Sequence, residues 1–574
     1  MAQAQLKSTA LLTLPPEIQT KIFSNLTVSF GTSNLQGVLR TCKQLYEVAL
    51  PLSVSIFRNT VRHPRGQGPC SRVRNAQFLR YILVSKPWLA AHVKTVILGR
   101  VSEDGEDADG KNLPQDVTES ELSVYHQHIR FILGQLPSEF NDRWCSRWVE
   151  DLRRGASSDA QAALILLTCP NIQRLLFEKP STSCHFIRLL QLVHNLRDIH
   201  ESIYSPGSVW TVSPRMVIPL SNVQDVFHET IDWKGGYTTF SVEGPSIFRF
   251  PQIKSYECIL AYGHQAAADN FRALPPRSSS IEKITLRSCH CSAMMLKSML
   301  GACKALKKLE ISHFQIHSED ASVKFMMPRD ILDAILPHAD TIQHLYLSLE
   351  EEFDKQWSWK ACPERLYMGT GLRQMHKLKR LTLGMQALAG MLPSQPESRS
   401  DDSYDCPMPL EIEGSARIID CLPEGLEYLK ISECGIMILE QVAELLNIIE
   451  QGYRFKRLAY IGLLFSGWLM QEADDLNAFE ALRCNGTKVR LEMGIQSHNA
   501  FYHDLGEGIP EVLKTTRFLH EGDAEELADR EGYRNTMSRI YAPHCRQFNL
   551  RSRGASDYQA VWCTWRDDPD TFVE

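Results

Sequence analysis

The sequence predicts an α/β fold, a solenoid with parallel strands on its inner side and helices on its outer side, preceded by a small helical module. A six-residue apolar template, U-x-x-U-x-U with U apolar and x any residue, recurs through the middle of the chain. Stretches with helical apolar periodicity lie between the copies. Because one strand–helix unit cannot bury both of its faces, neighbouring units must stack against each other.

The composition indicates a globular protein. The chain has 574 residues, of which 43% are hydrophobic and 23% charged, and its formal net charge is -6. This balance provides no overall positive field for nucleic acid. The longest apolar stretch, Leu458 to Met470, is shorter than the about 20 residues that a membrane span needs, and no signal-peptide pattern opens the chain. We expect a soluble protein of the cytoplasm, the nucleus or both, with reduced cysteines and no membrane or nucleic-acid partner.

The helical module is predicted over residues 10–55. Its first helix follows Leu-Pro-Pro-Glu-Ile at Leu14 to Ile18, where the prolines suit the first turn and Glu17 favours the positive end of the helix. Ile18, Ile22 and Leu26 then form one apolar stripe. A second stripe runs from Leu35 to Tyr46. A module of this size is near the lower limit for burying its own core, so its apolar surface is expected to dock onto something else.

These residues, together with Thr41-Cys42-Lys43-Gln44-Leu45-Tyr46, resemble an F-box. In that family the helical surface binds the Skp adaptor of a cullin-RING (SCF) ubiquitin ligase. At Leu45-Tyr46 the sequence departs from the tryptophan that many members carry. The resemblance implies that Leu26, Leu35 and Leu45 support the helix packing. The adaptor contacts that it implies are Leu14, Pro15, Ile18, Ile22, Leu39 and Cys42. Alternatively, or in addition, the two helices cap the end of the solenoid.

The template defines a repeat region over residues 75–495. Copies from residue 172 onward begin 24 to 48 residues apart, and most intervals lie near the 20 to 29 residues of leucine-rich repeats. Ser280 to Leu306 resembles the repeat region of fungal F-box proteins with degenerate leucine-rich repeats. Unrelated α/β units are the alternative. The copies begin at Val93, Ile172, Ile253, Ile281, Leu306, Ile342, Leu378, Leu426 and Phe455, with weaker ones at Leu196 and Val223.

Two insertions and a tail complete the predicted organisation. Residues 101–120 form an acidic loop and residues 391–415 a loop rich in proline and serine. Both compositions are typical of surface loops. The repeat disappears before residues 497–574, which are expected to form a C-terminal cap or tail.

No motif indicates catalysis, a metal or a cofactor. The sequence lacks a P-loop, an H-E-x-x-H helix, a G-x-S-x-G elbow and a G-x-G-x-x-G turn. Cys289-His290-Cys291 has no second ligand pair at zinc spacing. Cys169 or Cys184 with His185 could form a thiol and base, but Cys169 lies in an apolar segment typical of a structural thiol.

The resemblance therefore implies a non-catalytic substrate receptor of an SCF ligase, which binds the adaptor and through it a cullin, and which presents an unidentified target protein. The alternatives are a repeat scaffold without a ligase, or an enzyme whose site is assembled from distant residues. Polar positions within the strands are the expected readers of the target. They are Lys283, Arg287, Lys308, Glu310, His344, Tyr346, Arg380, Tyr428 and Lys430.

Overall fold

The computed structural model describes the parts of the chain on which the following sections rest. They are residues 11–30, 35–59, 71–99, 117–133, 142–154, 158–178, 185–193, 219–229, 238–239, 243–259, 261–263, 265–287, 290–312, 326–348, 365, 367–390, 417–435, 438–466, 489–496 and 561–564. The predicted loop at 391–415, the weak copy at Leu196 and most of the tail lie outside these ranges, as do residues 101–116 of the acidic loop.

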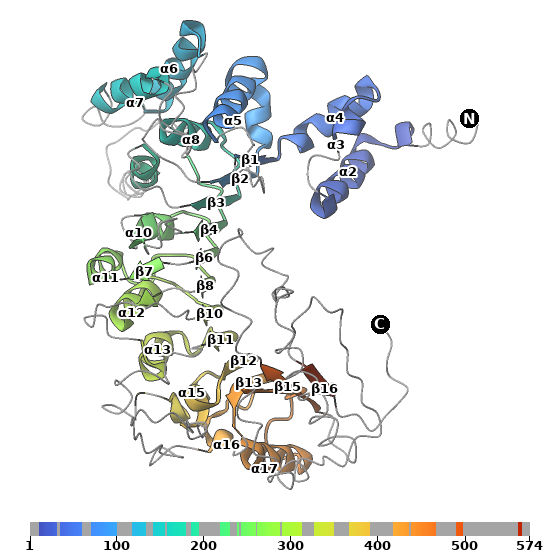
Figure 1. The fold of residues 1–574 in the computed structure, drawn as a ribbon, viewed down its shortest axis with the longest axis vertical. Coiled ribbons are helices and arrows are strands. Elements are labelled where there is room, and N and C mark those ends of the chain that lie inside the picture. Colours follow the sequence, from blue (N-terminus) through green and yellow to red (C-terminus); the bar gives the residue numbers. More distant parts are fainter. Residues whose placement is uncertain are drawn as a thin grey trace, which may run out of the picture. The chain divides into compact units, whose positions relative to one another are not determined.

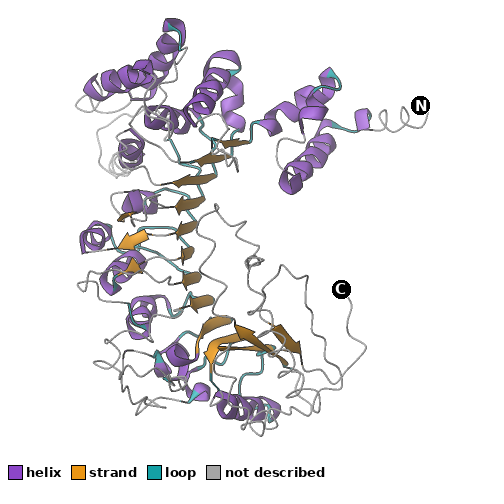
Figure 2. Ribbon diagram, in the orientation of Figure 1, coloured by secondary structure: helices purple, strands orange, loops and turns teal. Residues whose placement is uncertain are grey.

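The chain divides into two units, and each is an α/β structure with parallel strands. The first unit comprises residues 1–283 and 302–304, and the second comprises residues 284–301 and 305–574. In both units the labelled helices that follow residue 70 lie to one side of the strands (Figure 1, Figure 2). The predicted α/β class with parallel strands and helices beside them is thus confirmed, and the arrangement is compatible with a solenoid.

In the first unit the strands pair in the order β1, β2, β3, β4, β6, and every pair is parallel. The sheet begins ahead of the predicted repeat region, directly after the helical module. The strands are β1 (Ile56–Arg58), β2 (Thr95–Leu98), β3 (Arg174–Glu178), β4 (Asp225–Glu229) and β6 (Ser255–Ile259), with a short pair β5 (Thr238–Thr239) and β7 (Ala261–Gly263).

Helices precede β1 and connect the later strands. They are α2 (Pro16–Phe30), α3 (Leu35–Leu39), α4 (Lys43–Ser53), α5 (Ser71–Leu79), the π-helical turn η2 (Arg80–Ser85), the 3₁₀ turn η3 (Pro87–His92), α6 (Glu119–Leu133), α7 (Asp142–Arg154), α8 (Ser158–Thr168), a helix at residues 185–193, α10 (Glu243–Phe248) and α11 (Gln265–Arg272).

In the second unit the strands pair in the order β10, β11, β12, β13, β14, β15, β16. All pairs are parallel except β15 with β16, where a short piece of the predicted tail adds an antiparallel strand. These strands are β10 (Lys308–Ser312), β11 (His344–Ser348), β12 (Arg380–Gly384), β13 (Tyr428–Cys434), β14 (Tyr460–Ser466), β15 (Arg490–Gln496) and β16 (Val561–Thr564). The unit boundary falls within β8 (Lys283–Arg287), and β9 (His290–Cys291) follows it.

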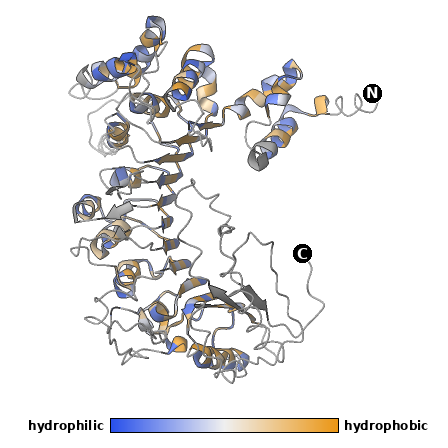
Figure 3. Ribbon diagram, viewed as in Figure 1, coloured by the Kyte–Doolittle hydropathy of each residue, from blue (hydrophilic) through white to orange (hydrophobic). Residues whose placement is uncertain are grey.

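The helices of the second unit are shorter on average than those of the first. They are α12 (Ala293–Gly301), α13 (Pro328–Ile335), η5 (Leu336–His338), η8 (Gly369–Gln374), α15 (Met385–Ala389), α16 (Ile418–Cys421) and α17 (Ile438–Glu450). Figure 3 shows hydrophobic and hydrophilic residues together along α17. Its Val442, Leu445 and Leu446 are buried while Glu450 is exposed, as expected for an amphipathic helix that covers a core.

The template residues form the core. In the copy that leads into β10, for example, Leu306, Leu309 and Ile311 are all buried, while Lys308 and Glu310 between them are half-buried. This alternation is the period of two that a strand requires. The copies that lead into β2, β3, β6, β8, β11, β12 and β13 bury their three apolar residues in the same way.

A backbone seam repeats at the entrance of the strands. The carbonyl oxygen of Lys307 accepts hydrogen bonds from the amides of Gln343 and His344, at 2.8 and 3.0 Å. The same bifurcated bond joins the next repeats along each unit. The other accepting carbonyls are those of Ser55, Lys94, Gln173, Gln224 and Lys254 in the first unit and of Gln343 and Lys379 in the second.

The last predicted copy is wrong by three residues. The template was placed at Phe455, Leu458 and Tyr460, but Tyr428 of β13 pairs with Tyr460, which puts Tyr460 outside the core. The buried residues that align with the other copies are Leu458, Ile461 and Leu463. Phe455 is buried in the preceding turn, where it adopts a left-handed backbone with φ 55°.

Candidate protein-interaction surfaces

Helix α2 presents two apolar side chains to solvent. Ile18 is 45% exposed and Ile22 is 37% exposed, and they lie four residues apart on one face of the helix. The next positions along the chain, Gln19 and Phe23, are buried instead. The helix therefore turns Gln19 and Phe23 inward and leaves Ile18 and Ile22 of the predicted apolar stripe on its outer side.

The inner face of α2 belongs to a small core. Phe23, Leu35, Leu45 and Ala49 are buried together, so α2, α3 and α4 pack as one module. Leu35 and Leu45 have the supporting position that the F-box resemblance implies, whereas the side chain of Leu26 lies outside the described residues. The sequence pattern did not single out Phe23, because it stands beside a stripe that is apolar as well.

Gln19 fixes the entry into the helix. Its amide nitrogen Nε2 donates to the carbonyl oxygens of Leu11 and Leu14, at 3.0 and 2.9 Å. These bonds hold the turn that carries Leu14 and Pro15 against the start of α2. Pro15 is exposed and Leu14 is half-buried. Thus Pro15, Ile18 and Ile22 provide exposed apolar surface on consecutive turns.

Leu39 and Cys42 occupy a different environment. Both are half-buried and pack against the core of the module. They are therefore only partly accessible to a partner. Of the six residues that the resemblance implies for adaptor contact, Pro15, Ile18 and Ile22 are exposed, and Leu14, Leu39 and Cys42 are half-buried.

The module also contacts the repeat region of its own unit. Lys86, just before η3, donates to the phenol oxygen of Tyr46 on α4, and its ammonium lies 4.9 Å from the centre of the Tyr46 ring. This hydrogen bond raises the pKa of Lys86 above its ordinary value. Leu50, Val54 and Leu89 are buried beside this contact. Tyr46, at the position where many F-box members carry tryptophan, is thus engaged within the chain.

The second surface is the strand face of the second unit that is turned away from the helices. Strand pairing aligns Lys308, His344, Arg380, Tyr428 and Tyr460 across β10 to β14. We call this line the ladder. A parallel line two residues further along contains Glu310, Tyr346, Thr382, Lys430 and Gly462. Most of the predicted target readers are therefore brought together, and Tyr346 is 39% exposed.

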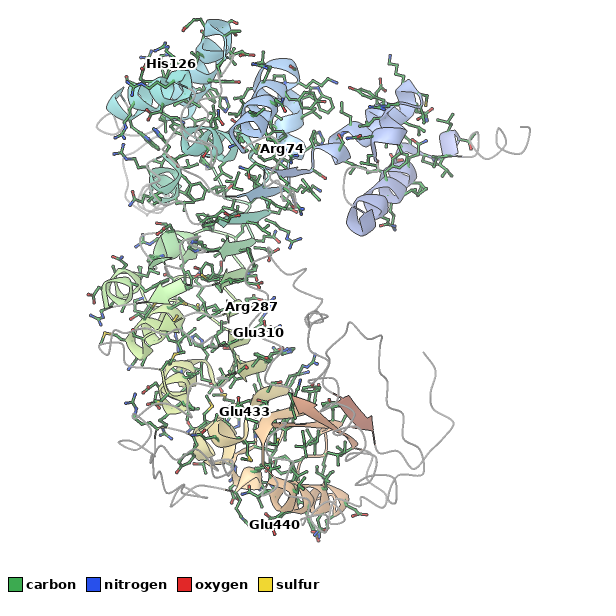
Figure 4. All side chains as sticks on the ribbon, viewed as in Figure 1. Arg74, His126, Arg287, Glu310, Glu433 and Glu440 are labelled. Atoms are coloured by element: carbon green, nitrogen blue, oxygen red, sulfur yellow. The ribbon has the colours of Figure 1, made fainter. Side chains whose placement is uncertain are left out.

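The remaining two predicted readers belong to β8. Lys283 lies in the first unit, and Arg287 lies in the second. Figure 4 shows Arg287 and Glu310 on the strand side of the second unit. Glu310 accepts a hydrogen bond from the hydroxyl of Thr285 at 2.9 Å. Its carboxylate also forms an ion pair with the Lys308 ammonium at 2.6 Å.

An aromatic stack lies at the end of the ladder. The rings of Tyr428 and Tyr460 are parallel, with centres 4.3 Å apart, and the Arg380 guanidinium carbon lies 4.7 Å from the centre of the Tyr428 ring. Gly462 makes room for this arrangement, since a Cβ there would come within 2.8 Å of the Tyr460 hydroxyl. Sequence reasoning missed Tyr460 because the misplaced template assigned it to the core.

The ladder is electrostatically positive around His344. Burial lowers the pKa of His344, and the nearby Arg380, Lys308 and Lys379 lower it further, against an opposing effect of Glu310. His344 is therefore neutral at neutral pH. Since its folded-state pKa lies below the unfolded value, this group's contribution to stability is present above about pH 6.5 and is lost as the pH falls through the folded-state pKa.

We expect the titration of His344 to report on Arg380. In histidine side-chain NMR spectra of the full chain, assigned with His344→Gln, the His344 midpoint lies below the ordinary 6.5. Arg380→Gln raises the midpoint because it removes a neighbouring positive charge. Arg373→Gln, an exposed arginine on η8, leaves it unchanged. An unchanged midpoint in Arg380→Gln would contradict the positive field described above.

The candidate thiol and base do not form a reactive pair. Cys169 is buried, and burial raises the pKa of its thiol far above the ordinary value, so the thiol stays protonated. The indole N–H of Trp144 donates to Nδ1 of His185 at 3.1 Å, and Nε2 of His185 lies 2.7 Å from Oδ2 of Asp151. Because an indole only donates, Nδ1 accepts and Nε2 carries the proton. Both ring nitrogens of this buried histidine are thus occupied by structural contacts.

The described residues contain no group of three or more histidine, cysteine, aspartate or glutamate side chains that could hold a metal ion. Cys184 and Cys289 lie outside these ranges. Among the described helices, none combines the length and the apolar character that crossing a bilayer requires.

Comparison with known proteins adds no family. None of the protein-family models matches the chain. No curated protein matches it either.

Proposed function

We propose that the protein is a substrate receptor of an SCF ubiquitin ligase, in which the α2–α4 module is an F-box and the repeats are degenerate leucine-rich repeats. The observation that carries the proposal is the outward pair Ile18 and Ile22 on a module that already has its own core. Because Phe23 fills the core, the exposed pair is not needed for packing within the module. Exposed apolar pairs on a helix suit a partner's apolar groove.

The proposed division of labour requires no catalytic residue in this chain. The module holds the Skp adaptor and through it a cullin, while the ladder face holds a target protein. Holding two reactants together raises their effective concentration, which is how a receptor accelerates ubiquitin transfer. Both ring nitrogens of His185 are occupied by hydrogen bonds, and the raised pKa keeps the Cys169 thiol protonated. Both observations agree with a function that needs no catalytic residue at this position.

The alternative is a repeat scaffold without a ligase. The observation that favours it is the contact of Tyr46 with Lys86, because a module that packs on its own repeats can also serve as an end cap. The two functions differ in one measurable property, the affinity for the adaptor.

A pull-down with purified Skp adaptor tests the proposal. The full-length chain is expected to retain the adaptor, and the adaptor to retain a cullin in the same complex. A Pro15→Ala/Ile18→Asp variant is expected to lose both, since it places a charge in the apolar surface while leaving the buried Phe23 core intact. If the wild-type chain does not bind the adaptor, the ligase proposal is refuted and the repeat scaffold without a ligase remains.

A further inference from the structure

The guanidinium of Arg380 is a positive charge on the ladder whose ligand has not yet been named. Two basic neighbours of Arg380 are paired with carboxylates, since Lys308 pairs with Glu310 at 2.6 Å and Lys379 pairs with Glu427 at 3.2 Å. Among the described residues, Arg380 has no carboxylate partner, and its side chain is exposed. Of these three basic groups, Arg380 therefore contributes the unmatched positive charge.

Arg380 is nevertheless held in place. Its guanidinium lies against the Tyr428 ring, and Tyr428 is stacked on Tyr460. A guanidinium held over an aromatic ring still has several N–H donors that can bind a ligand. Less conformational freedom is then lost when a ligand binds, which is a requirement for a specific site rather than a flexible surface charge.

The unmatched charge defines the ligand. A single guanidinium offers paired donors whose geometry fits a carboxylate, and one positive charge balances one carboxylate. Tyr346, which is 39% exposed, pairs with Thr382, two residues from Arg380 on the same face. An apolar or aromatic side chain next to the carboxylate can pack on its ring.

We propose that Arg380, supported by Tyr428 and Tyr460, binds an aspartate or glutamate side chain in an acidic peptide segment of the target protein, with an adjacent apolar residue packed on Tyr346. This inference deepens the proposed function by naming its substrate class, and it rests on that function for the assignment of the segment to a ligase target. Burial is the largest cause of the lowered His344 pKa, and the Arg380 charge, which lowers it further, also favours an anionic ligand at this position.

Selection from a random peptide library displayed on phage tests the inference on the full-length protein. Peptides selected by the wild-type chain are expected to be enriched in aspartate or glutamate beside an aromatic or aliphatic residue. Selection against Arg380→Gln is expected to lose the acidic enrichment. A wild-type selection without acidic enrichment would overturn the inference.

One selected peptide then gives the affinity. We expect it to bind Arg380→Gln at least about tenfold more weakly than wild type, because a charge-assisted bidentate contact is lost. Replacing its acidic residue with the matching amide is expected to cost a similar factor, and the two losses are not additive because they remove the same contact. Arg380→Lys is expected to bind more weakly than wild type, since lysine lacks the planar fork.

Arg373→Gln is the matched control, because it removes the same charge from an exposed arginine outside the ladder. It is expected to bind the peptide like wild type. Equal affinities for wild type and Arg380→Gln would refute the site. The adaptor pull-down separates the two proposals: peptide binding without adaptor binding sinks only the ligase function, and adaptor binding without acidic selectivity sinks only this inference.

Discussion

An Ile22→Asp variant is expected to bind the Skp adaptor at least about a hundredfold more weakly than the wild-type chain. Ile22 is 37% exposed on the outer face of α2, one turn from Ile18, whereas the following residue Phe23 is buried. In an adaptor complex its side chain would be desolvated, and an aspartate there would bury an unpaired charge. Titration of labelled adaptor with each variant measures the dissociation constant.

Thr20→Asp is the matched control for this experiment. Thr20 is exposed on the same helix, but it lies away from the stripe formed by Ile18 and Ile22. The same negative charge at this position is expected to leave adaptor binding within about twofold of wild type, as for a charge at the rim of an interface. An equal loss in both variants would mean that the charge, and not the apolar stripe, determines binding.

A Trp148→Ala variant is expected to destabilise the helices around α7 by about 3 to 5 kcal/mol, the usual cost of truncating a buried aromatic residue. Trp148 is 0% exposed, and its indole N–H donates to the carbonyl oxygen of Ala160 on α8 at 2.8 Å. Its ring stacks on Trp144, with centres 5.1 Å apart, and on His185, with centres 5.4 Å apart. Truncation removes contacts with both rings and the indole hydrogen bond to the Ala160 carbonyl.

Hydrogen exchange of the α8 amides, followed by mass spectrometry, measures this loss locally. We expect the α8 amides to exchange faster in Trp148→Ala, because the substitution lowers the free energy needed to open this region locally. Trp88→Ala is the control, because Trp88 is 52% exposed on η3 in the same unit. Unchanged α8 exchange in Trp148→Ala would show that α7 does not stabilise α8.

The core of the repeats was predictable because each strand imposes a period of two on its apolar residues. The template fails at β14, where Phe455, Leu458 and Tyr460 have the right spacing but the wrong phase. Leu458, Ile461 and Leu463 satisfy the same template, and the buried turn residue Phe455 gave the competing match. Apolar spacing alone cannot distinguish a strand residue from a buried turn residue.

The candidate surfaces were predictable only in part, for the same physical reason. The stripe of Ile18 and Ile22 is visible in the sequence, but Phe23 beside it is equally apolar, and only packing shows which of them faces inward. In the ladder, the positions on the strands were predictable from alternation. The stack of Arg380 on Tyr428 and Tyr460 depends on pairing between strands that are far apart in sequence, which no local pattern encodes.

The bifurcated hydrogen bonds at the strand entrances have a consequence for how such a chain can evolve. Each carbonyl, such as that of Lys307, joins two amides of the following repeat through backbone atoms alone. Any residue other than proline can supply the amides, and any residue can supply the carbonyl. The connection between successive repeats thus survives almost any substitution at these positions. Sequence likeness among the repeats can fade under drift while their geometric relationship is inherited unchanged.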